Sequence, residues 1–271
     1  EIGLATEMSS LLVKPSGCSG LLTDITPETA GWRYVGFQVH RLRPGQSLNA
    51  ETGTREICVV WLTGSGTATA GDLDFGLMGG RQTVFEGEPA AIYVPAGARW
   101  SVTAETDLEL AVCSAPGSSN HPPRAILPGD LTKETRGTGT NTRYVTNILP
   151  EDKPAHSLLV VEVITPGGHT SSYPPHKHDQ NNLPKESLLE ETYYHRINPP
   201  QGFAFQRVYT DDRTLDEALT VENGDTVRVP RGYHPCAACH GYDLYYLNVM
   251  AGPERIWRFR NDPAHEWLVE S

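Results

Sequence analysis

Residues 224–234 read Gly-Asp-Thr-Val-Arg-Val-Pro-Arg-Gly-Tyr-His, a strand-like run that ends in a Pro-x-Gly turn and a histidine, His234. Upstream, residues 176–178 read His-Lys-His, and residues 191–195 read Glu-Thr-Tyr-Tyr-His, another strand-like run. Alternate residues of a strand project from the same face of a sheet, so His176 and His178 can reach one ion. The candidate ligands therefore lie at strand ends and turns, where a small β-barrel has its mouth.

These residue types indicate a metal centre. Imidazole nitrogen and carboxylate oxygen suit zinc or manganese, which we expect first, and also iron or nickel. Four protein ligands on an octahedral ion leave positions open for substrate, and an open metal site acts as a Lewis acid. The expected ligands are His176, His178, Glu191 and His234.

The composition indicates a β-protein rich in turns. The 271 residues include 21 prolines and 26 glycines, and many short runs are rich in Val, Tyr and Thr. Helical periodicity is confined to brief stretches at 188–194 and 214–220. A chain of this length can hold two barrels of roughly 100–150 residues each.

The N-terminal half repeats the pattern without the ligands. Residues 86–100 parallel 222–234, with Trp100 near the position of the histidine, and Glu56 opens a strand-like run much as Glu191 does. Residues 49–54 contain no histidine. This indicates duplication, with one barrel that has lost its metal. Turn-forming residues crowd 116–141, so we expect a barrel without ligands over 1–130 and a barrel with the site over 131–271.

Charge and cysteine content restrict the partners and the compartment. The formal net charge of −11 argues against nucleic acid or an anionic membrane, although a small anion can bind locally. The sequence contains no membrane-length apolar run and no basic-then-apolar start, so we expect a cytoplasmic protein. The five cysteines fit reduced thiols. Residues 236–240 match the Cys-x-x-Cys-His pattern of haem attachment, but such attachment follows export, so we favour ordinary cysteines.

The stretch 224–234 resembles the second motif of the cupin superfamily, in which a Pro-x-Gly turn delivers the last histidine ligand. The resemblance implies an all-β bicupin, two jelly-roll cupin barrels in one chain. The C-terminal half is more closely similar to the 5-deoxy-glucuronate isomerase family of myo-inositol degradation. The similar stretches are 172–179, 183–195, 202–210, 229–235 and 241–252, with 143–150 and, more weakly, the N-terminal half.

That resemblance implies conversion of 5-deoxy-D-glucuronate to 5-dehydro-2-deoxy-D-gluconate, an aldose–ketose isomerisation. Moving a hydrogen between adjacent carbons requires acidifying a C–H bond, and a metal held by the two substrate oxygens stabilises the enediolate. A base must then carry the proton. Strand alternation points Tyr193 and His195 inward with Glu191, and Glu190 and Asp179 are further candidates.

The spacing departs from the superfamily pattern, because His178 and Glu191 are further apart than in the motif. Glu190 and Glu191 face opposite sides of a strand, so only one can bind the metal. We favour Glu191, which directly precedes the aromatic strand, with Glu186 a distant third. The intervening loop, which includes Lys185, could form a wall of the substrate pocket or a solvated surface loop.

Further residues could bind the substrate. Arg207 alternates with phenylalanines on its strand, so it could point inward and pair with a substrate carboxylate, or make a structural ion pair. Arg143 and Arg228 are weaker versions of the same idea. Tyr246 belongs to an aromatic cluster that either packs the barrel or offers a hydroxyl to a sugar oxygen.

Other functions remain open at this point. They are isomerisation of a related uronate, a metal-dependent cupin oxygenase and a sugar-binding bicupin without catalysis. Oxygen uptake would identify the oxygenase, and binding without turnover would identify the last. A homo-oligomer is also expected by analogy, because barrel edges and an extended N-terminal segment favour strand exchange.

Overall fold

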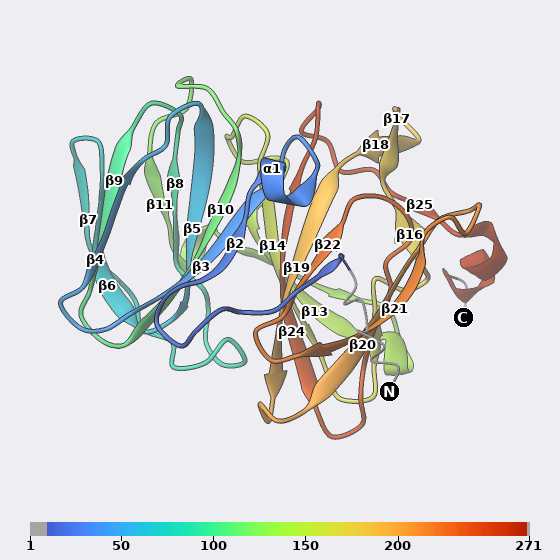
Figure 1. The fold of residues 1–271 in the computed structure, drawn as a ribbon. Helices are drawn as coiled ribbons and strands as arrows, with labels where there is room; N and C mark the ends of the chain where they lie inside the picture. Colours follow the sequence, from blue (N-terminus) through green and yellow to red (C-terminus); the bar gives the residue numbers. More distant parts are fainter. Residues whose placement is uncertain (1–9, 270–271) are drawn as a thin grey trace, which may run out of the picture.

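The computed structural model describes residues 10–269 and consists of two β-barrels side by side, with the larger sheets facing each other (Figure 1). Residues 1–9 lie outside this range, and they belong to the N-terminal stretch on which the expectation about export rested. Within residues 10–269, no helix combines the length and the apolar character needed to cross a membrane. The expected all-β class is confirmed.

Each barrel has one large and one small sheet. The large sheet of the first barrel has the order β11-β8-β5-β10-β3-β2, and its small sheet has the order β4-β9-β6-β7. The strands are β2 (Gly20–Ile25), β3 (Gly36–Leu42), β4 (Ser47–Glu51), β5 (Arg55–Thr63), β6 (Ser65–Ala70), β7 (Leu73–Gly79), β8 (Ala91–Val94), β9 (Arg99–Ala104), β10 (Leu108–Pro116) and β11 (Arg124–Ile126).

The second barrel has a large sheet of order β1-β22-β19-β24-β14-β13-β12 and a small sheet of order β15-β23-β20-β21. Two short ladders, β16-β25 and β17-β18, lie at its mouth. The strands are β1 (Leu12–Val13), β12 (Thr132–Arg136), β13 (Arg143–Leu149), β14 (Leu159–Thr165), β15 (Thr170–Ser171), β16 (His176–Lys177), β17 (Asp179–Asn182), β18 (Glu186–Leu188), β19 (Glu190–Asn198), β20 (Phe203–Tyr209), β21 (Asp216–Glu222), β22 (Thr226–Val229), β23 (Cys236–Ala238), β24 (Asp243–Ala251) and β25 (Arg260–Asn261).

Helices are short and lie outside the sheets. They are α1 (Pro27–Ala30) and the 3-10 turns η1 (Pro128–Asp130), η2 (Gly139–Asn141) and η3 (Pro263–Val269). The two stretches expected to be briefly helical, 188–194 and 214–220, lie instead largely in β19 and β21, so that expectation is wrong. In β19 the cause is burial on both faces, which hides the alternation typical of a half-buried strand.

The strand β1 belongs to the second barrel although it precedes the first barrel in sequence. Its residues pair with β22 of the same chain, Leu12 opposite Val227 and Val13 opposite Thr226. After β1 the chain therefore passes from the second barrel to the first, where β2 begins.

Residues 10–269 form three apolar clusters, one inside each barrel and one between the large sheets. Alternate residues of β5 enter different clusters, because a strand projects successive side chains to opposite faces. Ile57, Val59 and Trp61 face the first barrel's interior, whereas Cys58, Val60 and Leu62 lie in the cluster shared with the second barrel. The same alternation in β19 directs Tyr193 into the second barrel and Tyr194 to the interface.

Candidate metal centre and adjoining cavity

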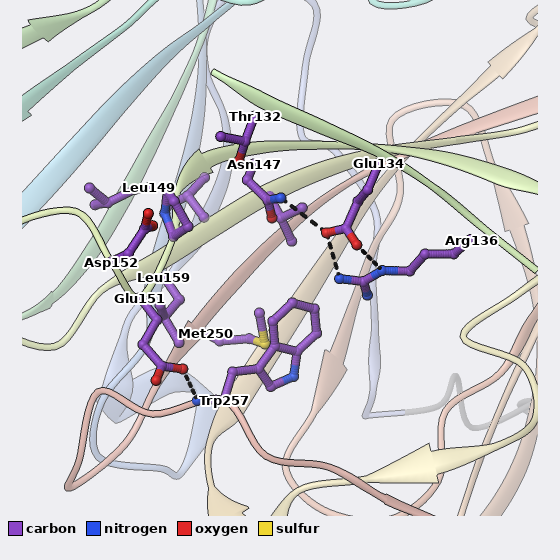
Figure 2. Close-up of a pocket in the computed structure, with 13 residues that line it drawn as sticks. Thr132, Glu134, Arg136, Asn147, Leu149, Glu151, Asp152, Leu159, Met250 and Trp257 are labelled. Carbon is purple, nitrogen blue, oxygen red and sulfur yellow. Dashed lines mark hydrogen bonds and ion pairs between the residues drawn. The ribbon is translucent and has the colours of Figure 1, made fainter. Parts of the chain in front are cut away.

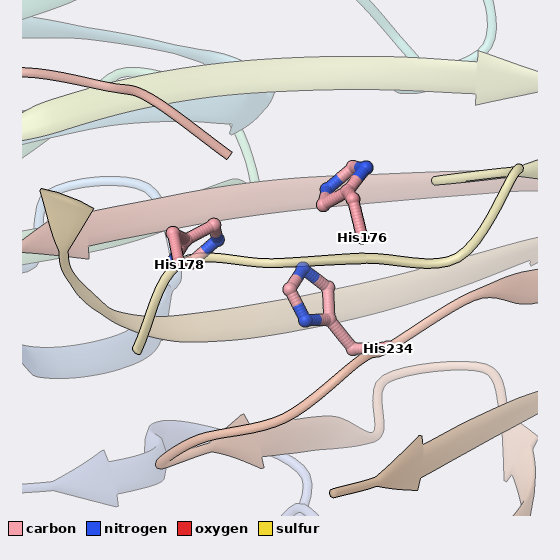
Figure 3. A group of neighbouring side chains, drawn as sticks. All are labelled: His176, His178 and His234. Carbon is pink, nitrogen blue, oxygen red and sulfur yellow. The ribbon is translucent and has the colours of Figure 1, made fainter. Parts of the chain in front are cut away.

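Three imidazoles meet at the mouth of the second barrel (Figure 3). His176 opens β16, His178 follows it, and His234 comes after the turn that ends β22. One nitrogen from each ring lies within 4.8 Å of the other two, and all three side chains are buried. The rings of His176 and His178 are each 5.0 Å from that of His234, centre to centre.

The carboxylate of Glu191 completes the cluster from β19. One of its oxygens, Oε2, lies 3.0 Å from His178 Nε2 and 3.1 Å from His234 Nε2. Glu191 is almost fully buried, so water does not solvate the carboxylate. The structure thus brings together the three histidines that the sequence singled out as ligands, and it places Glu191 against two of them, His178 and His234.

Backbone carbonyls fix which nitrogen of two of the rings carries hydrogen. His178 Nδ1 lies 3.0 Å from the oxygen of Leu189, and His234 Nδ1 lies 2.8 Å from the oxygen of Gly232. A carbonyl only accepts, so each Nδ1 carries the hydrogen and each Nε2 of a neutral ring offers a lone pair. Both lone pairs then face the Glu191 carboxylate, and a cation between them would remove the repulsion.

The pKa shifts of His176, His178 and Glu191 show that these side chains interact with one another. Burial lowers the pKa of His176 well below its usual value, and the neighbouring His234 and His178 lower it further. Burial also lowers the pKa of His178, but the hydrogen bond and charge of Glu191 outweigh burial and raise it. Burial raises the pKa of Glu191, but the two histidines outweigh it and lower it. The His178 imidazole and the Glu191 carboxylate thus stabilise each other's charged forms.

The turn that carries His234 is held on both sides. Gly232 has φ 89°, and an added Cβ would lie 2.5 Å from the oxygen of Tyr209, so only glycine fits. Its backbone N–H donates to Asp179 Oδ2 at 2.8 Å. The other carboxylate oxygen, Oδ1, accepts from the buried Lys177 at 2.6 Å, and Lys177 also reaches Glu186 at 2.8 Å.

A narrow cavity of about 20 Å³ adjoins His176 inside the second barrel. Besides His176, its polar lining includes Arg136 and Arg143 from the two strands at the sheet edge and the hydroxyls of Tyr193 and Tyr246. The remaining lining residues are Val145, Val161, Val163, Ser172, Asn248 and Trp257.

A wider cavity lies beside this one, and both are lined by Arg136, Val161 and Trp257. Figure 2 shows Glu134 between Asn147 and Arg136, with the Trp257 ring beside Met250. The guanidinium of Arg136 lies 5.2 Å from the centre of the Trp257 ring. Arg136 and Trp257 thus stand between the two cavities.

The four candidate bases occupy different places. Tyr193 lines the cavity, and its hydroxyl lies 2.8 Å from Ser172 Oγ. His195 lies deeper, with Nε2 2.9 Å from Gln206 Oε1; burial lowers its pKa to about 4 despite that hydrogen bond. The Asp179 carboxylate is engaged by Lys177 and Gly232.

Glu190 is wrong as a candidate base. It opens β19 one residue before Glu191 and faces the opposite side, away from the histidines. Its carboxylate accepts the backbone N–H groups of Arg33, Tyr34 and Val35 in the first barrel, at 2.7, 2.7 and 3.0 Å. The sequence comparison matched Glu56 with Glu191. The strand pairing shows instead that Glu56 is equivalent to Glu190, and that Ile57 is equivalent to Glu191.

Two of the expected substrate residues point away from the cavity. Arg207 lies on the outer face of β20 and pairs with Asp216 at 2.8 Å, so the inward orientation is wrong. Lys185 is exposed in the turn between β17 and β18. Tyr246 does line the cavity, and its hydroxyl lies 2.5 Å from Ser171 Oγ.

Arg143, a weaker candidate in the sequence, lines the cavity with His176. Arg136 and Asn248 line it too, but the sequence did not single them out. A signal existed for Asn248, since it alternates with Tyr246 along β24. Its Nδ2 donates to the oxygen of Thr192 at 3.3 Å. Arg136 comes from an edge strand whose partner the sequence does not reveal.

An all-β double barrel with a three-histidine, one-carboxylate cluster at one mouth defines a bicupin with a site that could hold a metal ion. The sequence matches the KduI/IolB family over residues 11–268, and the chain belongs to that family. A 5-deoxy-glucuronate isomerase of Geobacillus thermodenitrificans is 57% identical over 93% of this chain and 92% of its own. That of Bacillus subtilis strain 168 is 49% identical over 97% of this chain and its full length.

Solved structures agree. An IolB-like protein from Salmonella typhimurium LT2 superposes with a TM-score of 0.95 at 52% identity, over 96% of this chain and all of its own. An oxalate decarboxylase of Lactobacillus farciminis superposes at 0.68 over 97% of this chain and 91% of its own, at 14% identity, which concerns the fold alone. The expected bicupin fold is confirmed, and the chain is an enzyme of the isomerase class.

Proposed function

We propose that the protein converts 5-deoxy-D-glucuronate to 5-dehydro-2-deoxy-D-gluconate in myo-inositol degradation. The observation that carries the proposal is the cavity with Arg143 on its wall and His176 at its end. A uronate is an anion with a reactive aldehyde, so it needs a cation for its carboxylate and a polar centre for its C1 and C2 oxygens. Relatives of 57% and 49% identity carry the matching name.

The donor set fits a divalent ion, since two Nε2 lone pairs and a carboxylate oxygen converge beside a third imidazole. We propose His176, His178, Glu191 and His234 as ligands and zinc or manganese as the ion; iron or nickel would also suit these donors. When bound, the ion supplies a Lewis acid for the carbonyl and adjacent hydroxyl oxygens of the open-chain sugar.

The protein's own side chains orient the substrate. Arg143 would bind the carboxylate of the uronate, because a guanidinium recognises a carboxylate through paired hydrogen bonds. This places the aldehyde end toward His176. Asn248 and Tyr246 line the space between and offer polar groups to the sugar hydroxyls. The valines of the wall exclude water from the reacting carbons.

Of the four candidate bases, Tyr193 is the one that lines the cavity. Burial raises the pKa of Tyr193 well above its usual value, and the charge of Glu191 raises it further, so the hydroxyl stays protonated. We assign to Tyr193 the proton transfers at the substrate oxygens: its hydroxyl donates to the carbonyl oxygen on carbon one and receives the proton of the hydroxyl on carbon two. The proton that leaves carbon two and enters carbon one is carried by a separate base. Ser172, which is hydrogen-bonded to the Tyr193 hydroxyl, holds that hydroxyl in place.

The substrate assignment is tested by incubating the zinc- or manganese-loaded protein with 5-deoxy-D-glucuronate and with D-glucuronate and D-galacturonate in parallel. NMR follows aldehyde loss and ketose formation. Conversion of the 5-deoxy sugar at a kcat/KM at least about tenfold above the others supports the proposal, a difference of about 1.4 kcal/mol in transition-state binding. Equal or greater turnover of another uronate would identify that sugar as the substrate.

A further inference from the structure

Glu190 and Glu191 are adjacent at the start of β19 but serve different barrels. The side chain of Glu191 enters the second barrel and meets His178 and His234, whereas the side chain of Glu190 points toward the first. There its carboxylate accepts the consecutive N–H groups of Arg33, Tyr34 and Val35, in the loop between α1 and β3. Glu190 is 8% exposed, so these bonds are shielded from water.

A reciprocal arrangement exists on the other side of the molecule. Glu56, near the start of β5, accepts the N–H groups of His156, Ser157 and Leu158 at 2.8, 2.7 and 2.8 Å, just before β14 of the second barrel. It also accepts the hydroxyl of Tyr93 at 2.6 Å. Each barrel therefore holds one loop of the other through a buried glutamate: the loop before β3 in the first barrel and the loop before β14 in the second.

The ladder registers show that the two glutamates are equivalent. Glu56 lies opposite Ala115 on β10, and Glu190 lies opposite Ala251 on β24. The residue that follows each glutamate differs. In the first barrel it is Ile57, which lies opposite Val94, and in the second it is Glu191, which lies opposite Val229. A glutamate that accepts three backbone N–H groups of the other barrel is thus present in both barrels. Only in the second barrel is this glutamate next to a candidate ligand.

Strand ends fray unless tertiary contacts hold them, and Glu191 is the second residue of its strand. The three N–H groups that bind the Glu190 carboxylate hold Glu190, the residue directly before Glu191. The planar peptide bond between Glu190 and Glu191 transmits that constraint to the Glu191 backbone. The direction of the Glu191 side chain toward both histidines therefore depends on contacts made by the first barrel.

We infer that Glu190 is a positioning residue through which the first barrel, which lacks the ligands, holds Glu191 in the metal centre. The inference rests on the proposed function only in its use of the metal site. It gives the first barrel a role in a site to which it contributes no ligand. Partners of metal ligands commonly change metal affinity by 10–100-fold when they are removed.

The test compares Glu190→Gln with Glu56→Gln. The glutamine amide keeps the shape of the glutamate side chain, but its NH₂ group faces backbone N–H donors. Each variant therefore loses part of its hydrogen bonding to the other barrel. Zinc affinity is measured by competition with a chromophoric chelator, and stability by thermal unfolding. Both variants should lose stability, but Glu190→Gln should weaken zinc binding by about tenfold or more while Glu56→Gln leaves it within about twofold of the wild type.

Equal zinc affinity in the two variants, or no measurable zinc binding by the wild type, would overturn the inference. If either glutamine variant fails to fold, the pair Glu190→Asp and Glu56→Asp keeps the charge but shortens its reach, and the same difference is expected. The readout needs no substrate. A wild type that binds zinc but does not convert the sugar would reject the proposed function and leave the positioning role standing.

Discussion

The carboxylate of Asp179 accepts the backbone N–H of Gly232 at 2.8 Å, joining the segment after His178 to the turn before His234. Gly232 in turn receives the Nδ1 hydrogen of His234 on its carbonyl oxygen, at 2.8 Å. Two candidate ligands that are 56 positions apart in sequence, His178 and His234, are thus linked by a short chain of hydrogen bonds. Asp179 therefore acts on the site through the turn.

Replacing Asp179 by alanine should weaken zinc binding by about tenfold or more, because the turn loses its anchor and the buried Lys177 loses one of its two carboxylates. Chelator competition measures the affinity. The control is Asp216→Ala, which removes an exposed carboxylate paired with Arg207 and should leave affinity unchanged. Unchanged affinity in Asp179→Ala would show that the turn does not need the carboxylate.

Replacing Arg143 by alanine should raise KM for the uronate by about tenfold or more, since a hydrogen bond to a charged group contributes about 1.5–3 kcal/mol. Initial rates over a range of substrate concentrations give KM and kcat separately. Arg207→Ala is the matched control, because Arg207 is exposed on the outer face of β20. Similar KM values for the two variants would place the substrate carboxylate elsewhere.

Replacing Tyr193 by phenylalanine should lower kcat by about 10²-fold or more, because the hydroxyl that transfers the proton is lost while the ring remains. Zinc content should not change. In the control Tyr245→Phe, the hydroxyl lost belongs to the barrel interface, where it lies 2.9 Å from Glu162 Oε2. That variant should lose stability and keep kcat, whereas full activity in Tyr193→Phe would exclude Tyr193 from proton transfer.

The ion pair of Arg81 and Glu162 crosses the barrel interface with both side chains buried and two N–O distances of 3.0 and 2.9 Å. Arg81→Met should destabilise the protein by about 3–5 kcal/mol, because it leaves a buried carboxylate without its cation. Urea unfolding measures the loss. The double variant Arg81→Met, Glu162→Met should recover much of it, and a double variant no more stable than the single one would contradict this explanation.

The sequence was sufficient for the fold because its decisive features are local. The Pro-x-Gly-His turn and the His-x-His pair mark a barrel mouth without any knowledge of which strands pair. The aromatic strand after Glu191 likewise distinguishes it from Glu190, since the two side chains must face opposite sides.

Residues whose role depends on strand register could not be predicted in the same way. In β20 the large apolar Phe203 and Phe205 face solvent, whereas Ala204 and Gln206 face the barrel, so hydrophobicity gave the wrong orientation for Arg207. The equivalence of Glu56 with Glu190 required the ladder pairs on both sides. Likewise, nothing near β1 in the sequence indicates that it pairs with β22.

The most direct test follows metal-loaded wild type and His176→Ala with 5-deoxy-D-glucuronate in deuterated water by NMR, with the metal content of both measured. We expect the wild type to form the ketose, with deuterium at carbon one to the extent that the base carrying the carbon-bound proton exchanges with solvent. His176→Ala should lose both bound metal and conversion. Conversion by a metal-free His176→Ala, or none by a fully loaded wild type, would contradict a metal-dependent isomerase at this site.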